Sequence, residues 1–434
     1  MTFRQFLNEK LPGFGKFQIA GEDAEFSGRL YFDEDKRGYK LSGVLQSDVK
    51  GFDELLRAMN SSRNLSQIKG EVFGLGHVDL INPDGLLSKM SSAGLDYYEI
   101  SFEEMVIQEI KRIEIPDCIN SVRLSSNHIS NMWFGNSGFK VNPEFSQFKR
   151  WNSRIYERQE DKVLYSCDAF SLNLLNHYFE NTRFERHCLI EDKILKVDFS
   201  KAVGQNLVFE LSKKIARLIQ FLAGSYEPFK FFSYSNEGQF FRHYINLRED
   251  GDTRDVFKKR GLIAYKDFEP KSQLIIGEWL GLESMIPYAL ERYSIACQYL
   301  LKDDSEYYRS AFVDMCSCLE TYYYQYIDGE RESFKKIIKK LVKEVEHPKI
   351  VKCFQNDVHL KVAYTRHSFV HSINESDSRA KYILESTDIR RYATKLKALF
   401  EIVVLKRHFE FTQDEIYRRI AQPWPNTLFL NEMQ

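Results

Sequence analysis

The spacing of apolar residues changes along the chain, and this change constrains the fold more than any other feature. Residues 1–130 contain short segments in which apolar and polar residues alternate between polar, turn-forming stretches. From about residue 282 onward, apolar residues recur at intervals of three and four. Alternation is the period of a half-buried β-strand, and intervals of three and four are the period of an amphipathic helix. We therefore predict a multi-domain α+β protein, with a β-rich N-terminal domain followed by an all-α helical bundle.

The β-rich part is predicted to be sandwich-like. Residues 25–32 and 39–45 alternate and flank the polar stretch DEDKRG, which is the pattern of a β-hairpin. Several short strands at such spacing are typical of a β-sandwich. Residues 207–223 have the period of a helix. Further strands are predicted at 67–75, 97–102, 120–124, 194–199, 229–234 and 240–245.

The C-terminal part is predicted to be a bundle of five helices joined by short loops. A polar, turn-forming stretch at 250–273 marks the domain boundary. We expect a β-rich domain over 1–260, divisible into subdomains 1–145 and 146–260, and a helical domain over 275–421. The five helices are predicted at 285–301, 305–326, 333–345, 360–371 and 388–408.

Composition narrows the class of protein. The chain has 434 residues, 43% of them hydrophobic, which is enough to build a sizeable core and excludes intrinsic disorder. Seven scattered cysteines are typical of reduced thiols in a cytoplasm. We find no signal peptide and no uninterrupted apolar run of membrane-spanning length. The expected localisation is therefore cytoplasmic, with no membrane partner.

The net charge of −1 is an average over unlike parts. Residues 1–120 hold 14 Lys and Arg against 20 Asp and Glu, a net charge of −6, whereas residues 331–434 hold 20 against 13, a net charge of +7. The overall value alone argues against a polybasic nucleic-acid binder. The basic C-terminal end is compatible with an anionic partner.

The common motifs for nucleotide, metal and serine-hydrolase chemistry are absent from the sequence. Cys316 and Cys318 are two residues apart and point to different sides of a helix, so we interpret them as buried thiols. Cys353 and His359 lack further ligands at the spacing of a zinc site. We expect neither a metal nor a cofactor.

The segment 360–371 carries an unusual cation. On a helical wheel, Val362, Ala363, Phe369 and Val370 lie within about 60° on either side of Arg366. Arg366 therefore occupies the centre of the apolar arc. Burying a guanidinium, which stays charged, is costly unless it has a partner or faces a cleft. The alternative is an arginine that only extends its stem along the apolar surface or bridges two helices.

Two histidines lie beside this arginine. His367 and His371 share one flank of the wheel, at about 100° and 140° from Arg366. Histidine exchanges protons near neutral pH, and arginine can bind a phosphate with two parallel hydrogen bonds. Together they suit the cleavage of a phosphodiester. If the substrate is RNA, its own 2′-OH supplies the nucleophile.

Residues 366–371, Arg-His-Ser-Phe-Val-His, match the Rx4–6H motif of the HEPN superfamily. The order of the helices resembles an Apea-type HEPN domain. In that comparison, the helix containing Glu320 is similar to an earlier helix of the bundle, and helix 388–408 is similar to its closing helix. Residues 1–260 resemble, in length and texture, the domain that precedes HEPN in ApeA-like phage-defence proteins.

The resemblance implies a metal-independent endoribonuclease that acts in anti-phage defence by abortive infection. It assigns Arg366 to phosphate binding, His371 to proton transfer and His367 to positioning or substrate binding. Glu320 would orient Arg366; the alternative is a solvated or locally paired carboxylate. The expected partners are RNA, with transfer RNA among the candidates, and a second HEPN domain in a homodimer. A phage-derived trigger would be sensed by the N-terminal domain.

Two basic helices are candidates for an RNA channel, with Lys336, Lys340, Arg390 and Arg391 as the named RNA-binding residues. The alternative is an ordinary solvated helix face. An alternative function is a non-catalytic HEPN module that binds RNA or a nucleotide and dimerises, coupled to a β domain that binds a protein or a glycan. The other basic residues of the two helices are Lys335, Lys339, Lys343, Lys395 and Lys397.

Overall fold

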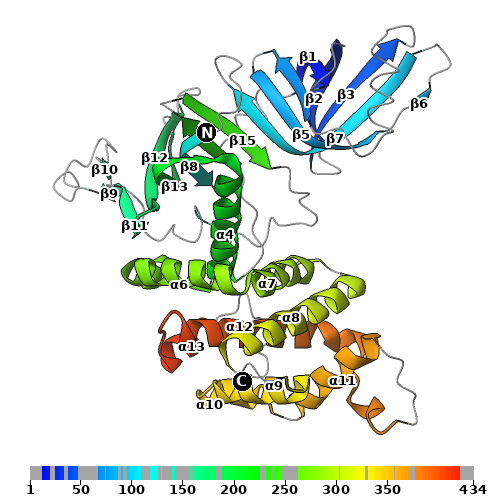
Figure 1. Cartoon of the computed structure of the whole chain (residues 1–434), viewed down its shortest axis with the longest axis vertical. Helices are drawn as coiled ribbons and strands as arrows, with labels where there is room; N and C mark the ends of the chain where they lie inside the picture. The colour runs from blue at the N-terminus through cyan, green and yellow to red at the C-terminus, as the bar shows by residue number, and fades with distance from the viewer. Residues whose placement is uncertain are drawn as a thin grey trace, which may run out of the picture. The chain divides into compact units, whose positions relative to one another are not determined.

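We analysed a computed structural model of the chain. The residues that it describes are 12–19, 25–33, 38–46, 67–73, 75–86, 89–90, 95–108, 118–125, 129, 139–141, 156–158, 161–181, 188–224, 231–236, 239–245, 262–302, 304–327, 331–355, 357–370 and 377–420. These residues form an α+β structure with antiparallel sheet in the N-terminal part and helices in the C-terminal part (Figure 1). The chain divides into two compact units.

The first unit contains the strands, and the second contains the helices α5 to α13. The helix α4 (Gln205–Ala223) contributes its first eight residues to the first unit and the rest to the second. The strands are β1 (Gly13–Ile19), β2 (Glu25–Asp33), β3 (Gly38–Gln46), β4 (Gln67–Val72), β5 (Gly76–Leu86), β6 (Lys89–Met90), β7 (Leu95–Gln108), β8 (Cys118–Ser125), β9 (Phe139–Val141), β10 (Tyr156–Arg158), β11 (Lys162–Ser166), β12 (Phe170–Asn181), β13 (Cys188–Gly204), β14 (Phe231–Asn236) and β15 (Gln239–Ile245).

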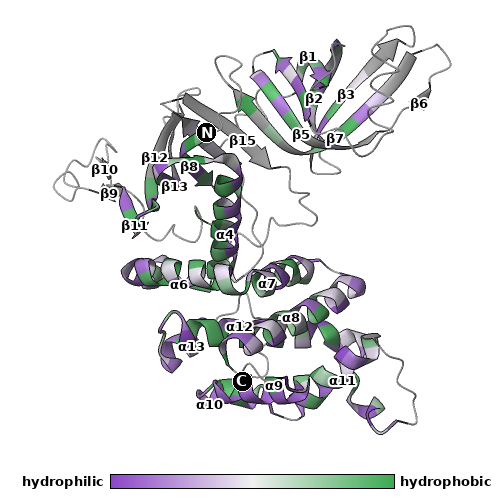
Figure 2. Ribbon diagram, in the orientation of Figure 1, coloured by the Kyte–Doolittle hydropathy of each residue, from purple (hydrophilic) through white to green (hydrophobic). Residues whose placement is uncertain are grey.

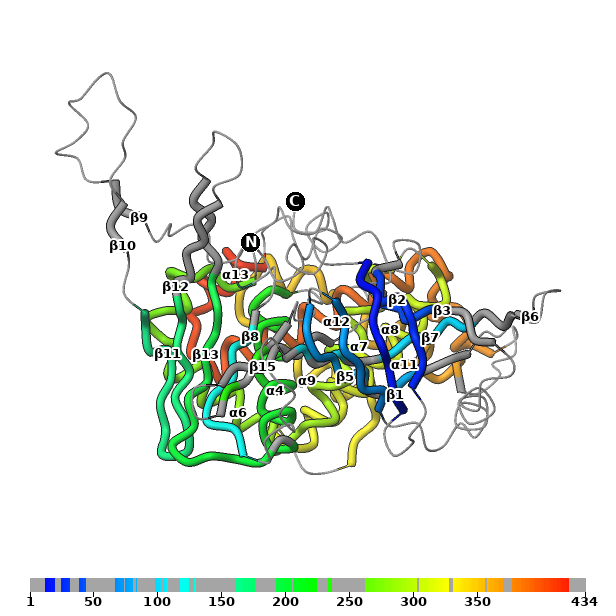
Figure 3. The backbone as a smooth tube through the Cα atoms, turned by 90° about the horizontal axis from the view of Figure 1, so that it is seen from above, coloured from blue at the N-terminus to red at the C-terminus, as the bar shows by residue number. Residues whose placement is uncertain are grey.

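Most strands belong to one 13-stranded antiparallel sheet. Its order is β11-β12-β13-β8-β14-β15-β7-β3-β2-β1-β4-β5, and β5 pairs in turn with β7. The predicted hairpin of β2 and β3 is present, with Arg29 opposite Ser42. Viewed from above, β11, β12 and β13 lie side by side (Figure 3). The predicted sandwich is wrong, because all of the described strands except the pair β9 and β10 belong to one continuous sheet.

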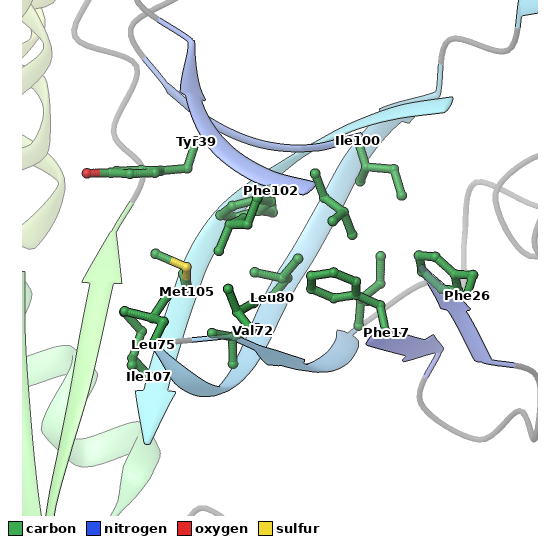
Figure 4. Close-up of a cluster of buried hydrophobic side chains, with 14 of the residues drawn as sticks. Phe17, Phe26, Tyr39, Val72, Leu75, Leu80, Ile100, Phe102, Met105 and Ile107 are labelled. Carbon is green, nitrogen blue, oxygen red and sulfur yellow. The ribbon is translucent and has the colours of Figure 1, made fainter. Parts of the chain in front are cut away.

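Six strands of this sheet close into a ring. The strand β7 has 14 residues; one of its edges pairs with β3, and the other pairs with β5. The ring β7-β3-β2-β1-β4-β5 encloses an apolar core that includes Phe17, Leu80 and Met105 (Figure 4). A Cβ atom on Gly70 would lie 2.3 Å from the Phe17 ring, so the close approach of β1 and β4 requires glycine here.

The helices of the second unit are α5 (Tyr265–Phe268), α6 (Ser272–Met285), α7 (Pro287–Leu300), α8 (Ser305–Tyr326), α9 (Phe334–Lys343), α10 (Pro348–Lys352), α11 (Val358–Val370), α12 (Ser386–Arg407) and α13 (Gln413–Ile420), with 3-10 turns at Glu269–Lys271 and Ala380–Tyr382. All five predicted helices are present. The sequence reasoning missed α6, which is apolar on most sides and contains two glycines that disfavour helix.

The core of the second unit is aromatic and includes the end of α4. Phe221 of α4 lies 5.1 Å from Trp279 and 5.7 Å from Tyr293, measured between ring centres. Trp279 also donates a hydrogen bond of 3.1 Å from Nε1 to the carbonyl oxygen of Lys214. The end of α4 therefore packs with the helices, whereas the sequence placed the whole of 1–260 in one β-rich domain.

Candidate functional site

The helix α11 carries Arg366 on the flank of its buried face. Val358, Val362 and Thr365 are buried, and this stripe is centred about 70° around the helix from Arg366. Thr365 is fully buried. Its Oγ1 accepts a hydrogen bond of 2.9 Å from the backbone N–H of Leu384, which offsets the cost of burying a polar group. The prediction that Arg366 lies at the centre of the buried arc is wrong, because this hydrogen bond lets a polar threonine occupy the core-facing position.

Arg366 forms a two-pronged ion pair with Glu320 of α8. Nη1 donates to Oε1 at 3.2 Å, and Nη2 donates to Oε2 at 2.6 Å. The two side chains keep 30% and 27% of their surface exposed. The pair thus joins α11 to α8 across 46 residues of sequence and leaves the guanidinium accessible. The structure brings together two of the predicted site residues.

A ring supports the other side of this guanidinium. The Cζ atom of Arg366 lies 4.6 Å from the ring centre of Phe334, the first residue of α9. Burial lowers the pKa of Arg366, but the hydrogen bonds and charge of Glu320 raise it, and the net change is upward. The guanidinium uses two of its five N–H donors on Glu320. An anion could therefore bind the remaining donors while the pair stays intact.

A second cluster connects this site to the lysines of α9. Tyr323 donates a hydrogen bond of 2.9 Å to Oε2 of Glu332, and Tyr324 donates one of 3.0 Å to its backbone carbonyl oxygen. Lys340 lies 3.1 Å from Oε1 of Glu332 and 5.5 Å from the Tyr323 ring centre. The hydrogen bond from Tyr323, with the charges of Lys340 and Lys336, lowers the pKa of Glu332. Lys336 and Lys340 therefore lie together beside the Arg366 site.

The helix α9 is strongly amphipathic (Figure 2). Its buried face consists of Phe334, Ile337, Ile338 and Leu341, and its five lysines take the other positions except that of Val342. Within the described residues, Lys335, Lys336 and Lys339 make no ion pair. His359 of α11 has a pKa lowered by burial and by the charges of Lys339 and Lys335. The exposed side of α9 therefore carries a positive potential.

The structure does not bring the other predicted cations to this site. Arg390 lies with its Cζ 4.7 Å from the ring centre of Tyr308, twelve residues before Glu320 on α8. Twelve residues of helix span about 18 Å. Arg391 is 3.8 Å from Asp388 on its own helix. Arg390 and Arg391 thus lie at the far end of α8 from Arg366.

Two lysines of α12 that were expected to face RNA are buried instead. Lys395 donates a hydrogen bond of 3.1 Å to the carbonyl oxygen of Cys353. Lys397 pairs with Glu401 at 2.6 Å, and the two side chains are 4% and 0% exposed. The expectation is wrong for both, because each ammonium finds an internal acceptor that offsets its loss of hydration.

Of the two predicted histidines, His367 is in the part of the chain that the structure describes. His367 is exposed and contributes to the lowered pKa of Asp377. Hydrogen bonds from Arg379 are the main cause of that pKa, which is about 2. His371 lies outside the described residues.

Sequence reasoning missed the aromatic partners of the site. Phe334 and Tyr324 were not among the candidate site residues. Tyr364, three residues before His367, stacks with Tyr382, and their ring centres are 5.7 Å apart. The general tendency of arginine to lie over aromatic rings is the signal that could have suggested the contact of Arg366 with Phe334.

Cys316 and Cys318 are buried, as expected, and burial raises the pKa of both thiols. In the part of the chain that the structure describes, no three or more His, Cys, Asp or Glu side chains are grouped to hold a metal ion. No helix in the same part is long and apolar enough to cross a membrane.

Comparisons with protein-family models, with curated proteins and with solved structures found no match to this chain.

Proposed function

We propose that the chain is an endoribonuclease of HEPN type, in which Arg366 binds the scissile phosphate and His371 transfers a proton. The observation that carries this proposal is the half-exposed, two-pronged Arg366–Glu320 pair on the helix that bears the Arg-His motif. A guanidinium held on one side by a carboxylate and below by a ring is pre-oriented for an anion. The Arg-His motif and the order of the helices support the assignment to the HEPN superfamily.

In the proposed reaction, the 2′-OH of RNA attacks the neighbouring phosphorus. A base removes the proton of that hydroxyl, the bond to the 5′-oxygen of the next nucleotide breaks, and a proton goes to that leaving oxygen. The products are a 2′,3′-cyclic phosphate and a 5′-OH. Arg366 stabilises the negative charge that develops on the phosphoryl oxygens. Because the nucleophile belongs to the substrate, this reaction uses no cofactor.

The substrate path in this proposal runs over α9. Lys336 and Lys340 lie next to Glu332 and Tyr323, and Phe334 connects that helix to Arg366. Lysines contact phosphates without reading sequence, so they supply affinity and not specificity. Arg390, which stacks on Tyr308, would extend the path toward the other end of α8.

The biological proposal is anti-phage defence by abortive infection. The HEPN unit would act as a homodimer in the cytoplasm, and the β-rich unit would sense a phage-derived trigger. The positive helical end and the acidic N-terminal region, with net charges of +7 and −6, are compatible with restraint by charge.

The test of this proposal is expression of the full chain in cells, followed by mapping of RNA ends. The wild type should arrest growth and generate new RNA ends, and Arg366→Ala and His371→Ala should do neither while remaining folded. Arg418→Ala, which removes an exposed arginine from α13 of the same unit, is the matched control. RNA binding without cleavage by the wild type would favour the non-catalytic alternative. New ends in a folded His371→Ala protein would contradict the proposal.

A further inference from the structure

The outer face of the closed ring carries exposed aromatic side chains. Phe14 of β1 is 63% exposed, and Phe73, directly after β4, is 78% exposed. Residues alternate along β1, so Phe17 points into the apolar core while Phe14 points outward. The backbone N–H of Phe73 donates a hydrogen bond of 2.9 Å to the carbonyl oxygen of Phe14, so the two residues lie on neighbouring segments.

An arginine continues the same row. Arg29 of β2 is directly opposite Phe14 in the strand register and is exposed. Its Cζ atom lies 5.9 Å from the ring centre of Phe14 and 5.8 Å from that of Tyr31. Neighbouring strands are about 4.8 Å apart, so these flat groups stand side by side on one sheet surface. We call Phe14, Arg29, Tyr31 and Phe73 the aromatic face.

The core of the ring does not need these side chains, because it is closed by other residues. Among the residues that the structure describes, sixteen buried ones form this core, and neither Phe14 nor Phe73 is among them. Leaving two neighbouring phenylalanines in water forgoes the free energy of burying them, and such patches mark binding surfaces. The aromatic face is therefore a candidate for ligand binding in the first unit, separate from the Arg366 site.

The chemistry of the aromatic face suits unpaired nucleotides. Aromatic rings on a flat sheet stack on bases of any sequence, and an arginine among them can both stack and contact a phosphate. Lys16 is also exposed on this side of β1, but Glu71 lies opposite it in the register. Arg29 is then the main phosphate contact, so stacking and not charge should supply most of the affinity.

We propose that the aromatic face binds a short run of unpaired nucleotides by base stacking. This binding would be independent of RNA cleavage and would give the β-rich unit a nucleic-acid site of its own. Its salt dependence should be shallow, because a single neutralised phosphate on a single strand gives a slope of about −0.7 in log K against log salt. Binding along the lysines of α9 should have a steeper slope.

The test uses the full chain with Arg366→Ala, so that RNA stays intact. Labelled single-stranded RNA and DNA 12-mers, and the corresponding duplex, are irradiated with the protein, and the cross-linked peptides are identified. Single strands should cross-link to peptides containing Phe14 or Phe73, and the duplex should not. Equal cross-linking by RNA and DNA supports pure stacking, and cross-linking by RNA alone supports a contribution of the 2′-OH.

The matched variants are Phe14→Leu/Phe73→Leu, which keeps apolar side chains without rings, and Tyr288→Leu, which removes an exposed ring from the second unit. The double variant should lose the cross-links and weaken the shallow-slope binding at least about tenfold, because both stacking rings are removed. Tyr288→Leu should do neither. Cross-links confined to 331–370, or none, would overturn the proposal, as would binding of a protein at this face with no nucleic-acid binding. Inactivity of the wild type as a ribonuclease would leave it standing.

Discussion

Replacement of Glu320 by glutamine tests the geometry of the Arg366 site. The variant Glu320→Gln keeps the size of the side chain but removes its charge and one of the two oxygen acceptors. Arg366 then loses the 2.6 Å or the 3.2 Å hydrogen bond, together with the charge that holds it. Its guanidinium should become free to leave the Phe334 ring.

The expected loss of stability follows from the exposure of the pair. A fully exposed ion pair contributes about 0–1 kcal/mol, and breaking a fully buried one costs about 3–5 kcal/mol. With 30% and 27% of the two side chains exposed, the Arg366–Glu320 pair lies between these limits. We expect a coupling free energy of about 1.5 kcal/mol, which is roughly a tenfold change in an unfolding equilibrium.

The assay is a double-mutant cycle in urea, with the wild type, Glu320→Gln, Arg366→Gln and the double variant. Glu291→Gln, an exposed glutamate of α7, is the control and should change the free energy of unfolding by less than about 0.5 kcal/mol. Glu320→Gln should also slow RNA cleavage, but less than Arg366→Ala does. A coupling free energy below about 0.3 kcal/mol would refute the pairing as an organising contact of the site.

Two further predictions concern the surroundings of the site, and a third concerns the pH dependence of stability in the helical unit. Phe334→Leu keeps an apolar side chain but removes the ring under Arg366, so RNA cleavage should fall several-fold. Because Phe334 is buried, the free energy of unfolding should also fall, by about 1 kcal/mol, which leaves the protein folded in the assay. Equal cleavage by both proteins would show that the ring does not position the guanidinium. Lys336→Ala/Lys340→Ala should make the slope of log K against log salt for single-stranded RNA shallower by about 1.4. Lys266→Ala/Arg418→Ala removes the same charge elsewhere and should leave the slope unchanged. Equal slopes for the wild type and Lys336→Ala/Lys340→Ala would show that RNA does not bind along α9. Burial lowers the pKa of His408, and the hydrogen bond and charge of Glu278 oppose this effect only in part. The folded state therefore favours the neutral ring. The stability that results is present above the ordinary histidine pKa of about 6.5 and is lost as the pH falls from there through the lowered pKa of the folded state. His408→Gln should therefore flatten the free energy of unfolding between about pH 7 and pH 5, and an unchanged slope in urea titrations would contradict this.

Local periodicity predicted most of the described elements because it records which side of a strand or helix is buried. It could not predict the closed ring, which depends on β7 pairing along both edges with strands distant in sequence. A repeating pattern of apolar residues is the same in a sandwich and in a ring. The continuous sheet is therefore a property of pairing partners and not of any one strand.

The site shows the same limit. The identity of Arg366 as a candidate came from a motif and from its place in an apolar arc, but that arc did not include Thr365 because threonine is polar. Thr365 is buried because Leu384, 19 residues later, supplies its hydrogen bond. Lys397 likewise looked exposed, and its pairing with Glu401 one turn later lets both charges lie inside the bundle. The hydrogen bond to Thr365 comes from outside α11. The Lys397–Glu401 pair lies within α12, but its burial depends on neighbouring helices such as α7, whose Tyr293 donates a hydrogen bond to Glu401.

The central claim is most directly tested by the chemistry of the RNA ends. Purified full-length protein is incubated with RNA in the presence of EDTA, and the 3′ ends are analysed for the wild type, Arg366→Ala and Arg418→Ala. We predict 2′,3′-cyclic phosphate ends for the wild type and Arg418→Ala, and a loss of at least about 100-fold for Arg366→Ala, the size expected when a group that stabilises transition-state charge is removed. Cyclic-phosphate ends at an undiminished rate from folded Arg366→Ala would contradict the account.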